Sequence, residues 1–254
     1  GEGWTGGDCA IPSTQQALKA NIYQMEGVGA FSDDIRDAIK GNVFDSEDKG
    51  FVSGKDGMEE SLKFGIVGGV EHDEVAHSEA AWCANPRQHI SYVSCHDDHN
   101  LRDRLEHLSP DASEEERLKM AKLAHFGVFT SQGVPFIFCG EEMYRSKRGE
   151  KNTYNMPDEY NAIDWALKSQ YGDLVEYCKG LIAMRKEHPA FSLGTAEAVR
   201  EHLKFIECDD EAAVGFVLDN LEGIDSAKRI VVLMNGSREG VEFDIPTGTY
   251  TISG

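Results

Sequence analysis

Residues 90–99, ISYVSCHDDH, decide the fold of this chain. The first five residues form a run of strand length, and the polar cluster of residues 96–99 follows almost at once. A second such run, residues 134–139 (VPFIFC), ends on the polar stretch of residues 140–142 (GEE). Because a helical pattern separates the two runs, the sequence predicts βα units and a parallel sheet.

The predicted helices have clear signals at their ends. Ser113 and Glu116 form a capping box, so we expect a helix to begin at residue 114. A further helix is predicted for residues 173–187, and it ends before Pro189. The side chains expected on its buried face are Cys178, Leu181, Ile182 and the stem of Arg185.

The pattern changes near residue 194. Short apolar runs, separated by turn signals such as Asn235-Gly236, predict an antiparallel all-β domain. These runs cover residues 202–207, 213–218, 230–234, 241–245 and 250–252. We therefore divide the chain into an α/β domain, residues 1–193, and a β domain, residues 194–254.

Composition limits the classes of function. A formal net charge of −20 argues against nucleic-acid binding, which requires Lys and Arg at the phosphates, but it is compatible with a neutral sugar. No apolar run approaches the roughly 18 residues that a membrane span needs, so we expect no membrane segment. The six cysteines show no CxxC spacing, and we expect buried thiols rather than disulfides or a zinc site.

Three polar clusters lie where a β/α barrel builds its active site, at the carboxyl ends of strands. They are residues 2–4 (EGW), 96–99 (HDDH) and 140–142 (GEE). Glycoside hydrolysis uses one carboxyl group as proton donor and other carboxylates to stabilise an oxocarbenium-like transition state. Glu2 and Asp97 are therefore candidate catalytic residues, and Trp4 offers a flat surface for a sugar ring.

The order of these clusters resembles the α-amylase superfamily, glycoside hydrolase family 13. The resemblance rests on residues 1–4 (GEGW), 92–101 (YVSCHDDHNL) and 132–142 (QGVPFIFCGEE). The continuation through residues 145–147 (RSK), 152–158 (NTYNMPD) and 161–165 (NAIDW) is most similar to type I pullulanases. The similarity covers essentially the whole chain.

This resemblance implies a fold and a place within it. The chain would be a C-terminal fragment that holds the second half of a (β/α)8 TIM barrel, from the end of strand five to helix eight. A C-terminal antiparallel β-sandwich domain would follow, and the chain would end in or just after one of its strands. We also expect self-association through the exposed faces of the half-barrel.

The resemblance also implies residue roles. Glu2 matches the general acid/base and Asp97 the transition-state stabiliser, while the side chains that match substrate contacts are Trp4, His96, Asp98 and Asp158. Many relatives have Asn at the position of Asp98, and pullulanases often have an aromatic residue at the position of Arg102. We expect these two differences to change substrate contacts rather than the catalytic groups. The family's nucleophilic aspartate would lie upstream of Gly1, and we expect the chain alone to be inactive.

The implied reaction is the retaining hydrolysis of α-1,6-glucosidic bonds in pullulan, glycogen or starch dextrins. The partner is an α-glucan, and no cofactor is required. Other superfamily enzymes (neopullulanase, amylase or branching enzyme) and a non-catalytic glucan-binding module remain open. The sequence leaves the location in the cell open.

Metal binding is the main competing hypothesis for two segments. At most two of the four side chains of residues 96–99 can share one ion, because neighbours on an extended strand point to opposite faces. We therefore expect no metal there, and we expect His72 and His77 at the surface. Residues 45–57 form an acidic loop, but Lys49 stands at the fifth ligand position of an EF-hand, so a charged surface loop is favoured over structural calcium.

Four further side chains are expected either at the edge of the site or in the core. Glu141 and Glu142 either line the rim of a sugar cleft or pair with Arg145 or Lys147. Trp82 and Trp165 are expected in the core.

Overall fold

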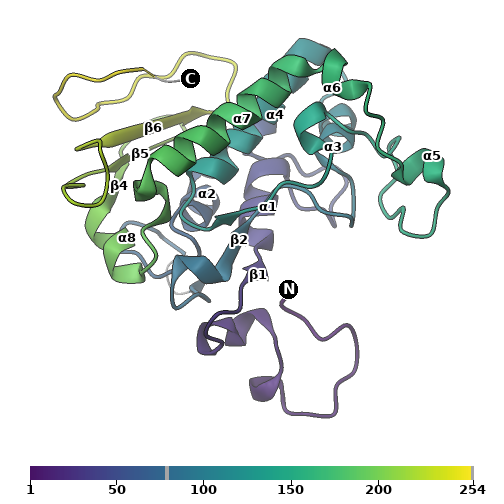
Figure 1. Ribbon diagram of the computed structural model, residues 1–254, viewed down its shortest axis with the longest axis horizontal. Coiled ribbons are helices and arrows are strands. Elements are labelled where there is room, and N and C mark those ends of the chain that lie inside the picture. The colour runs from purple at the N-terminus through teal and green to yellow at the C-terminus, as the bar shows by residue number, and fades with distance from the viewer. Residues whose placement is uncertain (78–79, 253–254) are drawn as a thin grey trace.

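The computed structural model describes residues 1–77 and 80–252 and contains the predicted parallel sheet (Figure 1). Its strands are β1 (Ala30–Phe31), β2 (His89–Ser91) and β3 (Val134–Pro135), in the order β1-β2-β3. Both pairs are parallel, with Ala30 opposite His89 and Ile90 opposite Val134. β2 and β3 are shorter than the predicted runs, and a bond from the Phe136 N–H to the Ser91 carbonyl lies just beyond the Ser91–Pro135 pair.

Helices connect the strands as βα units require. α1 (Asp33–Lys40) and α2 (Glu59–Ile66) lie between β1 and β2, α3 (Leu101–Leu108) and α4 (Glu114–Thr130) lie between β2 and β3, and α5 (Asp158–Asn161), α6 (Leu167–Gln170) and α7 (Gly172–Glu187) follow β3. Short 3-10 turns include Lys19–Gln24, Phe51–Ser53, Pro86–Gln88 and Glu141–Met143. The alternation of parallel strands and helices is the architecture of α/β proteins.

Local signals explain the helix boundaries. The Ser113 hydroxyl accepts from the Glu116 N–H at 3.2 Å, and the Glu116 carboxylate accepts from the Ser113 N–H at 2.7 Å, which confirms the capping box at α4. α7 also occupies the predicted residues, with Cys178 and Leu181 buried. Ile182 is 36% exposed, so its predicted burial was wrong: the stripe that packs on α4 follows Leu174, Cys178 and Leu181.

A second sheet follows the α/β units. α8 (Ala196–His202) leads into β4 (Leu203–Ile206), β5 (Ala213–Leu218) and β6 (Ile230–Asn235), and these strands are antiparallel in the order β4-β5-β6. The three corresponding predictions are confirmed. The strands predicted for residues 241–245 and 250–252 were wrong, because these residues have no strand partner in the described part of the chain and remain irregular.

The two sheets share one hydrophobic core. Ile35 of α1, Val128 of α4 and Phe216 of β5 belong to the same buried cluster, and β5 packs on α2. Gly65 permits this packing, since a Cβ at that position would lie 2.7 Å from the Ile35 side chain. Figure 1 shows the second sheet and α8 at the opposite end of the molecule from α5.

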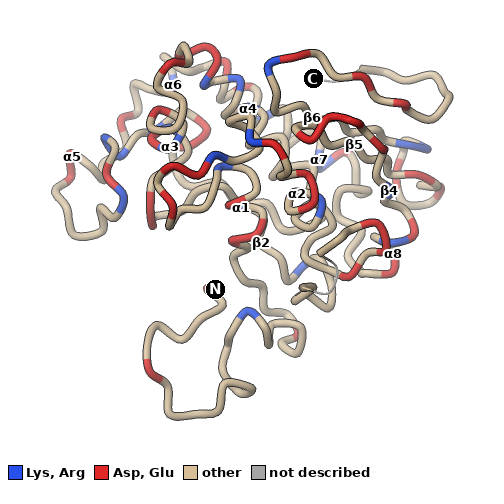
Figure 2. The backbone as a smooth tube through the Cα atoms, turned by 180° about the vertical axis from the view of Figure 1, so that it is seen from behind, with Lys and Arg blue, Asp and Glu red and all other residues tan. Residues whose placement is uncertain are grey.

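The surface is predominantly acidic, with 45 Asp and Glu against 25 Lys and Arg. The acidic residues are spread along helices and loops, and basic residues stand among them singly or in small groups (Figure 2). Within the described residues, every helix is too short or too polar to cross a membrane.

Candidate active site

The position of Glu2 follows from backbone pairing at the start of the chain. The Gly1 amino group donates to the Gly29 carbonyl at 2.9 Å, and the Phe31 N–H donates to the Gly1 carbonyl at 3.1 Å. One residue that bonds to positions 29 and 31 of its neighbour shows the pattern of a parallel ladder. Gly1 therefore extends the sheet beside β1, and Glu2 leaves the sheet at the same edge as the residues that follow β2.

His96 and Asp97 reach the same place from β2. One ring nitrogen of His96 and one carboxylate oxygen each from Glu2 and Asp97 lie within 4.8 Å of one another. The His96 Nε2 and Asp97 Oδ1 atoms are 3.4 Å apart, and all three side chains are exposed. The fold thus brings Glu2 to two adjacent residues, His96 and Asp97, that are far from it in sequence. This cluster, Glu2, His96 and Asp97, is called the carboxylate cluster below.

The other predicted substrate contacts are distributed differently. The Trp4 indole N–H donates to the Glu2 carboxylate. Trp4 is 61% exposed, so its ring lies in solvent beside the cluster. Asp98 has a left-handed backbone, φ 55°, and its N–H donates to Asn152. Asp158 is exposed in α5, which projects at the edge of the molecule away from the chain start (Figure 1). The substrate contacts of Asp98 and Asp158 therefore stay predictions, and the structure brings together Glu2, Trp4, His96 and Asp97.

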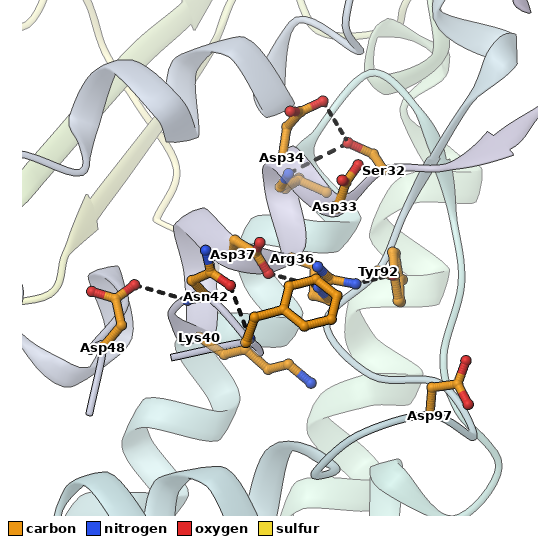
Figure 3. Close-up of polar contacts among 12 residues, drawn as sticks. Ser32, Asp33, Asp34, Arg36, Asp37, Lys40, Asn42, Asp48, Tyr92 and Asp97 are labelled. Carbon is orange, nitrogen blue, oxygen red and sulfur yellow. Dashed lines mark hydrogen bonds and ion pairs between the residues drawn. The ribbon is translucent and has the colours of Figure 1, made fainter. Parts of the chain in front are cut away.

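Two buried lysines, Lys40 and Lys147, bind the loop that carries His96 and Asp97, and neither was predicted to have this role. Lys147 Nζ donates to the carbonyls of His96, at 2.9 Å, and of Asp98. Lys40, the last residue of α1, donates to the His99 carbonyl at 2.9 Å, and its side chain extends toward this loop (Figure 3). Both lysines are 1% exposed, and burial lowers the pKa of each.

Glu141 is buried, and no cation among the described residues lies within ion-pair distance of it, so both interpretations of it were wrong. Neither carboxylate oxygen has a hydrogen-bond partner of good geometry among the described residues, although the Ser94 hydroxyl lies close. Burial raises the pKa of Glu141 to about 7, against the opposing effects of Ser94 and the Lys40 charge. Glu142 instead accepts from the Gly140 N–H.

Glu141→Gln is expected to change the pH dependence of stability. Because the pKa of Glu141 in the folded state is above its ordinary value, its contribution to stability is full below about pH 4.5 and is lost as the pH rises through about 7. The parent should lose about 1 to 2 kcal/mol more than the variant between pH 5 and pH 7. Urea unfolding across this range measures the difference, and parallel curves for the two proteins would contradict it.

Of the remaining histidine and tryptophan predictions, two are confirmed and two were wrong. His77 is exposed as expected, but His72 is fully buried, and its ring bonds to the Leu203 carbonyl. Trp82 is buried and donates to Asp34, whereas Trp165 is 67% exposed, so its placement in the core was wrong.

The six cysteines are free thiols, as predicted. Their expected burial holds for Cys83 and Cys178 and is wrong for Cys9 and Cys139, which are exposed. Cys139 follows the end of the β3 ladder, where the chain has left the sheet.

Neighbouring cations compensate the acidic residues around α1, and Figure 3 shows one such contact, between Arg36 and Asp37. The ion pairs are Lys19 with Asp33 and Asp34, Arg36 with Asp37, and Lys55 with Asp48. In the loop of residues 45–57, carbonyl oxygens of Asp45, Ser46 and Asp48 accept from the buried guanidinium of Arg104. A protein cation thus binds the oxygens that this acidic loop turns inward.

Comparison with known proteins identifies the family. A family model described as "Pullulanase, all-beta domain" matches residues 199–253. The pullulanase of Bacillus subtilis (strain 168) is 34% identical over 97% of this chain. The chain belongs to the pullulanase family. It spans 33% of that relative, so this pullulanase-family chain covers about a third of the length of a curated pullulanase.

Solved pullulanases have the same fold over this region. The pullulanase of Paenibacillus barengoltzii, in complex with maltohexaose and α-cyclodextrin, has a TM-score of 0.87 and 40% identity over 93% of this chain and 36% of that one. The type I pullulanase of Bacillus subtilis str. 168, in complex with maltose, has a TM-score of 0.90 and 32% identity over 97% of this chain and 34% of that one. The pullulanase family expected from the sequence motifs is therefore confirmed.

Proposed function

We propose that this chain supplies part of the active site of a debranching enzyme that hydrolyses α-1,6-glucosidic bonds with retention. The observation that carries the proposal is the carboxylate cluster, in which Glu2 and Asp97 meet His96 at one edge of the parallel sheet. Kinship with pullulanases supports the reaction class, and the maltooligosaccharides bound to solved relatives support an α-glucan as ligand.

Each residue has a proposed role in this reaction. Glu2 protonates the glycosidic oxygen and then acts as base toward water. Asp97 stabilises the positive charge that develops on the sugar ring, and His96 donates to sugar hydroxyls. Trp4 stacks on the sugar of the leaving group, while Asp98 and Asp158 contact further sugars. The reaction needs no cofactor.

The chemistry also defines the expected setting of the chain. We propose that its βα units form the second half of a (β/α)8 barrel and that the β domain packs beside that half. The covalent nucleophile that the family resemblance implies is not among residues 1–254. The parallel sheet ends on β3 at one edge and on β1, beside which only Gly1 pairs among the described residues, at the other, and such short-paired edges favour association with another chain or with a complementary half-barrel.

The direct test joins the chain to the rest of a pullulanase. In a chimera, residues 1–254 replace the homologous third of the Bacillus subtilis relative, and the relative supplies the nucleophile. The chimera should release reducing sugar from pullulan, whereas the 254-residue chain alone should release none, because one of the two steps of retaining hydrolysis lacks its nucleophile.

The same assay separates the competing functions. Hydrolysis of pullulan by the isolated chain would contradict the proposal. An inactive chimera, together with calorimetric binding of maltotriose by the isolated chain, would instead favour a glucan-binding module.

A further inference from the structure

The loop of residues 95–100 is attached to the protein through its carbonyl oxygens. The carbonyls of His96, Asp98 and His99 all accept from lysine ammonium groups below the loop. At the far end of the loop, the Asn100 side chain donates to the Arg145 carbonyl and accepts from the Asp103 N–H. These contacts fix the path of the backbone between β2 and α3, and the side chains of His96 and Asp97 are left exposed beside Glu2.

Lys147 uses all three of its N–H donors on carbonyl oxygens. Besides His96 and Asp98, it donates to Lys151 in its own loop. That loop is held in turn by Asp103 of α3, which accepts from the Lys147 N–H at 2.7 Å and from the Ser146 hydroxyl. The loops after β2 and β3 are thereby joined around a single ammonium group.

Burial makes these two ammonium groups costly. Among the described residues, no carboxylate lies within ion-pair distance of Lys147 or Lys40, and burial lowers the pKa of both. An apolar side chain of similar length would avoid this desolvation cost, but it would leave the loop carbonyls without donors. The two buried lysines therefore fix the conformation of this loop at a cost to the stability of the protein.

The left-handed backbone at Asp98 shows what the lysines hold in place. Asp tolerates this conformation better than most residues, but it remains uncommon outside glycine. Lys147 binds the Asp98 carbonyl, and Asn152 accepts from the Asp98 N–H at 3.2 Å. The two peptide planes that flank the Asp98 Cα, directly after Asp97, are thus each held by a side chain.

We propose that Lys147, together with Lys40, is a positioning residue that holds His96 and Asp97 against Glu2. The inference rests on the proposed function for the roles of those three residues. Lys147 and Lys40 do not touch the substrate in this scheme. They act through the backbone of residues 96–99.

Hydrogen exchange of the 254-residue chain tests the inference without requiring activity. Lys147→Met keeps the length of the side chain and removes its donors, so the Asp98 amide, which donates to Asn152, should exchange about 10- to 100-fold faster. The amides of β5 should be unchanged. Lys147→Arg retains charge and donors in a different geometry, so it should accelerate exchange less than Lys147→Met does. Lys119→Met, at an exposed lysine paired with Glu115, is the matched control.

A second variant keeps the inference testable if Lys147→Met does not fold. Lys40→Met removes one bond, to the His99 carbonyl, and should accelerate exchange of the Asp98 amide less than Lys147→Met does, because Lys147 binds two carbonyls of this loop. Unchanged exchange of the loop in both Met variants would overturn the inference, as would acceleration to the same extent in β5. Either result leaves the proposed function standing, and an inactive chimera would leave the exchange result standing.

Discussion

Glu2→Gln in the chimera is expected to lower kcat/KM on pullulan by about three orders of magnitude, within the range that general acid–base catalysis contributes. Gln cannot protonate the departing oxygen, but it keeps the size of Glu and can still accept from the Trp4 indole N–H. The fold should therefore be preserved. Steady-state kinetics measures the loss, and Glu26→Gln, at an exposed carboxylate in the same N-terminal segment, should retain full activity.

An activated substrate distinguishes the roles of the two carboxylates. In an aryl α-maltoside whose phenol is acidic, the phenolate leaves without being protonated. The Glu2→Gln chimera should therefore recover much of the rate of the first step on this substrate. Asp97→Asn should remain impaired on both substrates, because the sugar ring develops positive charge whichever group leaves. Equal losses for Glu2→Gln on both substrates would contradict its assignment as the acid.

Arg104→Met is expected to destabilise the protein by about 3 to 5 kcal/mol. Arg104 is 1% exposed, and its guanidinium donates to five carbonyls: those of Lys40, Asn42, Asp45, Ser46 and Asp48. Met fills the space but removes the guanidinium donors from all five oxygens, and among these the carbonyls of Asn42 and Asp45 keep a backbone N–H donor. Urea unfolding measures the effect.

Two further variants control for charge and for the loss of an arginine. Arg104→Lys keeps the charge but has three donors instead of a planar fork, so an intermediate loss is expected. Arg238→Met removes an exposed arginine that lies 3.3 Å from Glu116, and it should change the free energy of unfolding by no more than about 0.5 kcal/mol. A loss below about 1 kcal/mol for Arg104→Met would show that the loop does not depend on this guanidinium.

Sequence signals within a few residues predicted the elements whose ends are set by their own neighbouring residues. The capping box at Ser113 and Glu116 marked the start of α4, and the apolar run at residue 90 marked β2. α8 was missed, although Thr195 caps it and helix-forming residues follow. Residues 241–252 have the alternation and turn signals of strands, but a strand also requires a hydrogen-bonded neighbour, which a local pattern does not reveal.

The candidate site was predictable in its exposed residues and unpredictable in the residues beneath them. Glu2, His96 and Asp97 follow strands of one parallel sheet, so their meeting at one edge could be inferred from order alone. Lys147 and Lys40 act on carbonyl groups 51 and 59 positions away, and a lysine in sequence is normally read as a surface residue. Only the fold shows which backbone oxygens they reach.

Product analysis of the chimera acting on pullulan tests the proposed site most directly. Proton NMR of the first products should show maltotriose with its new reducing end in the α configuration, as cleavage of α-1,6 bonds with retention requires. Initial release of the β-anomer, or release of panose from cleavage at α-1,4 bonds, would contradict the reaction assigned to Glu2 and Asp97.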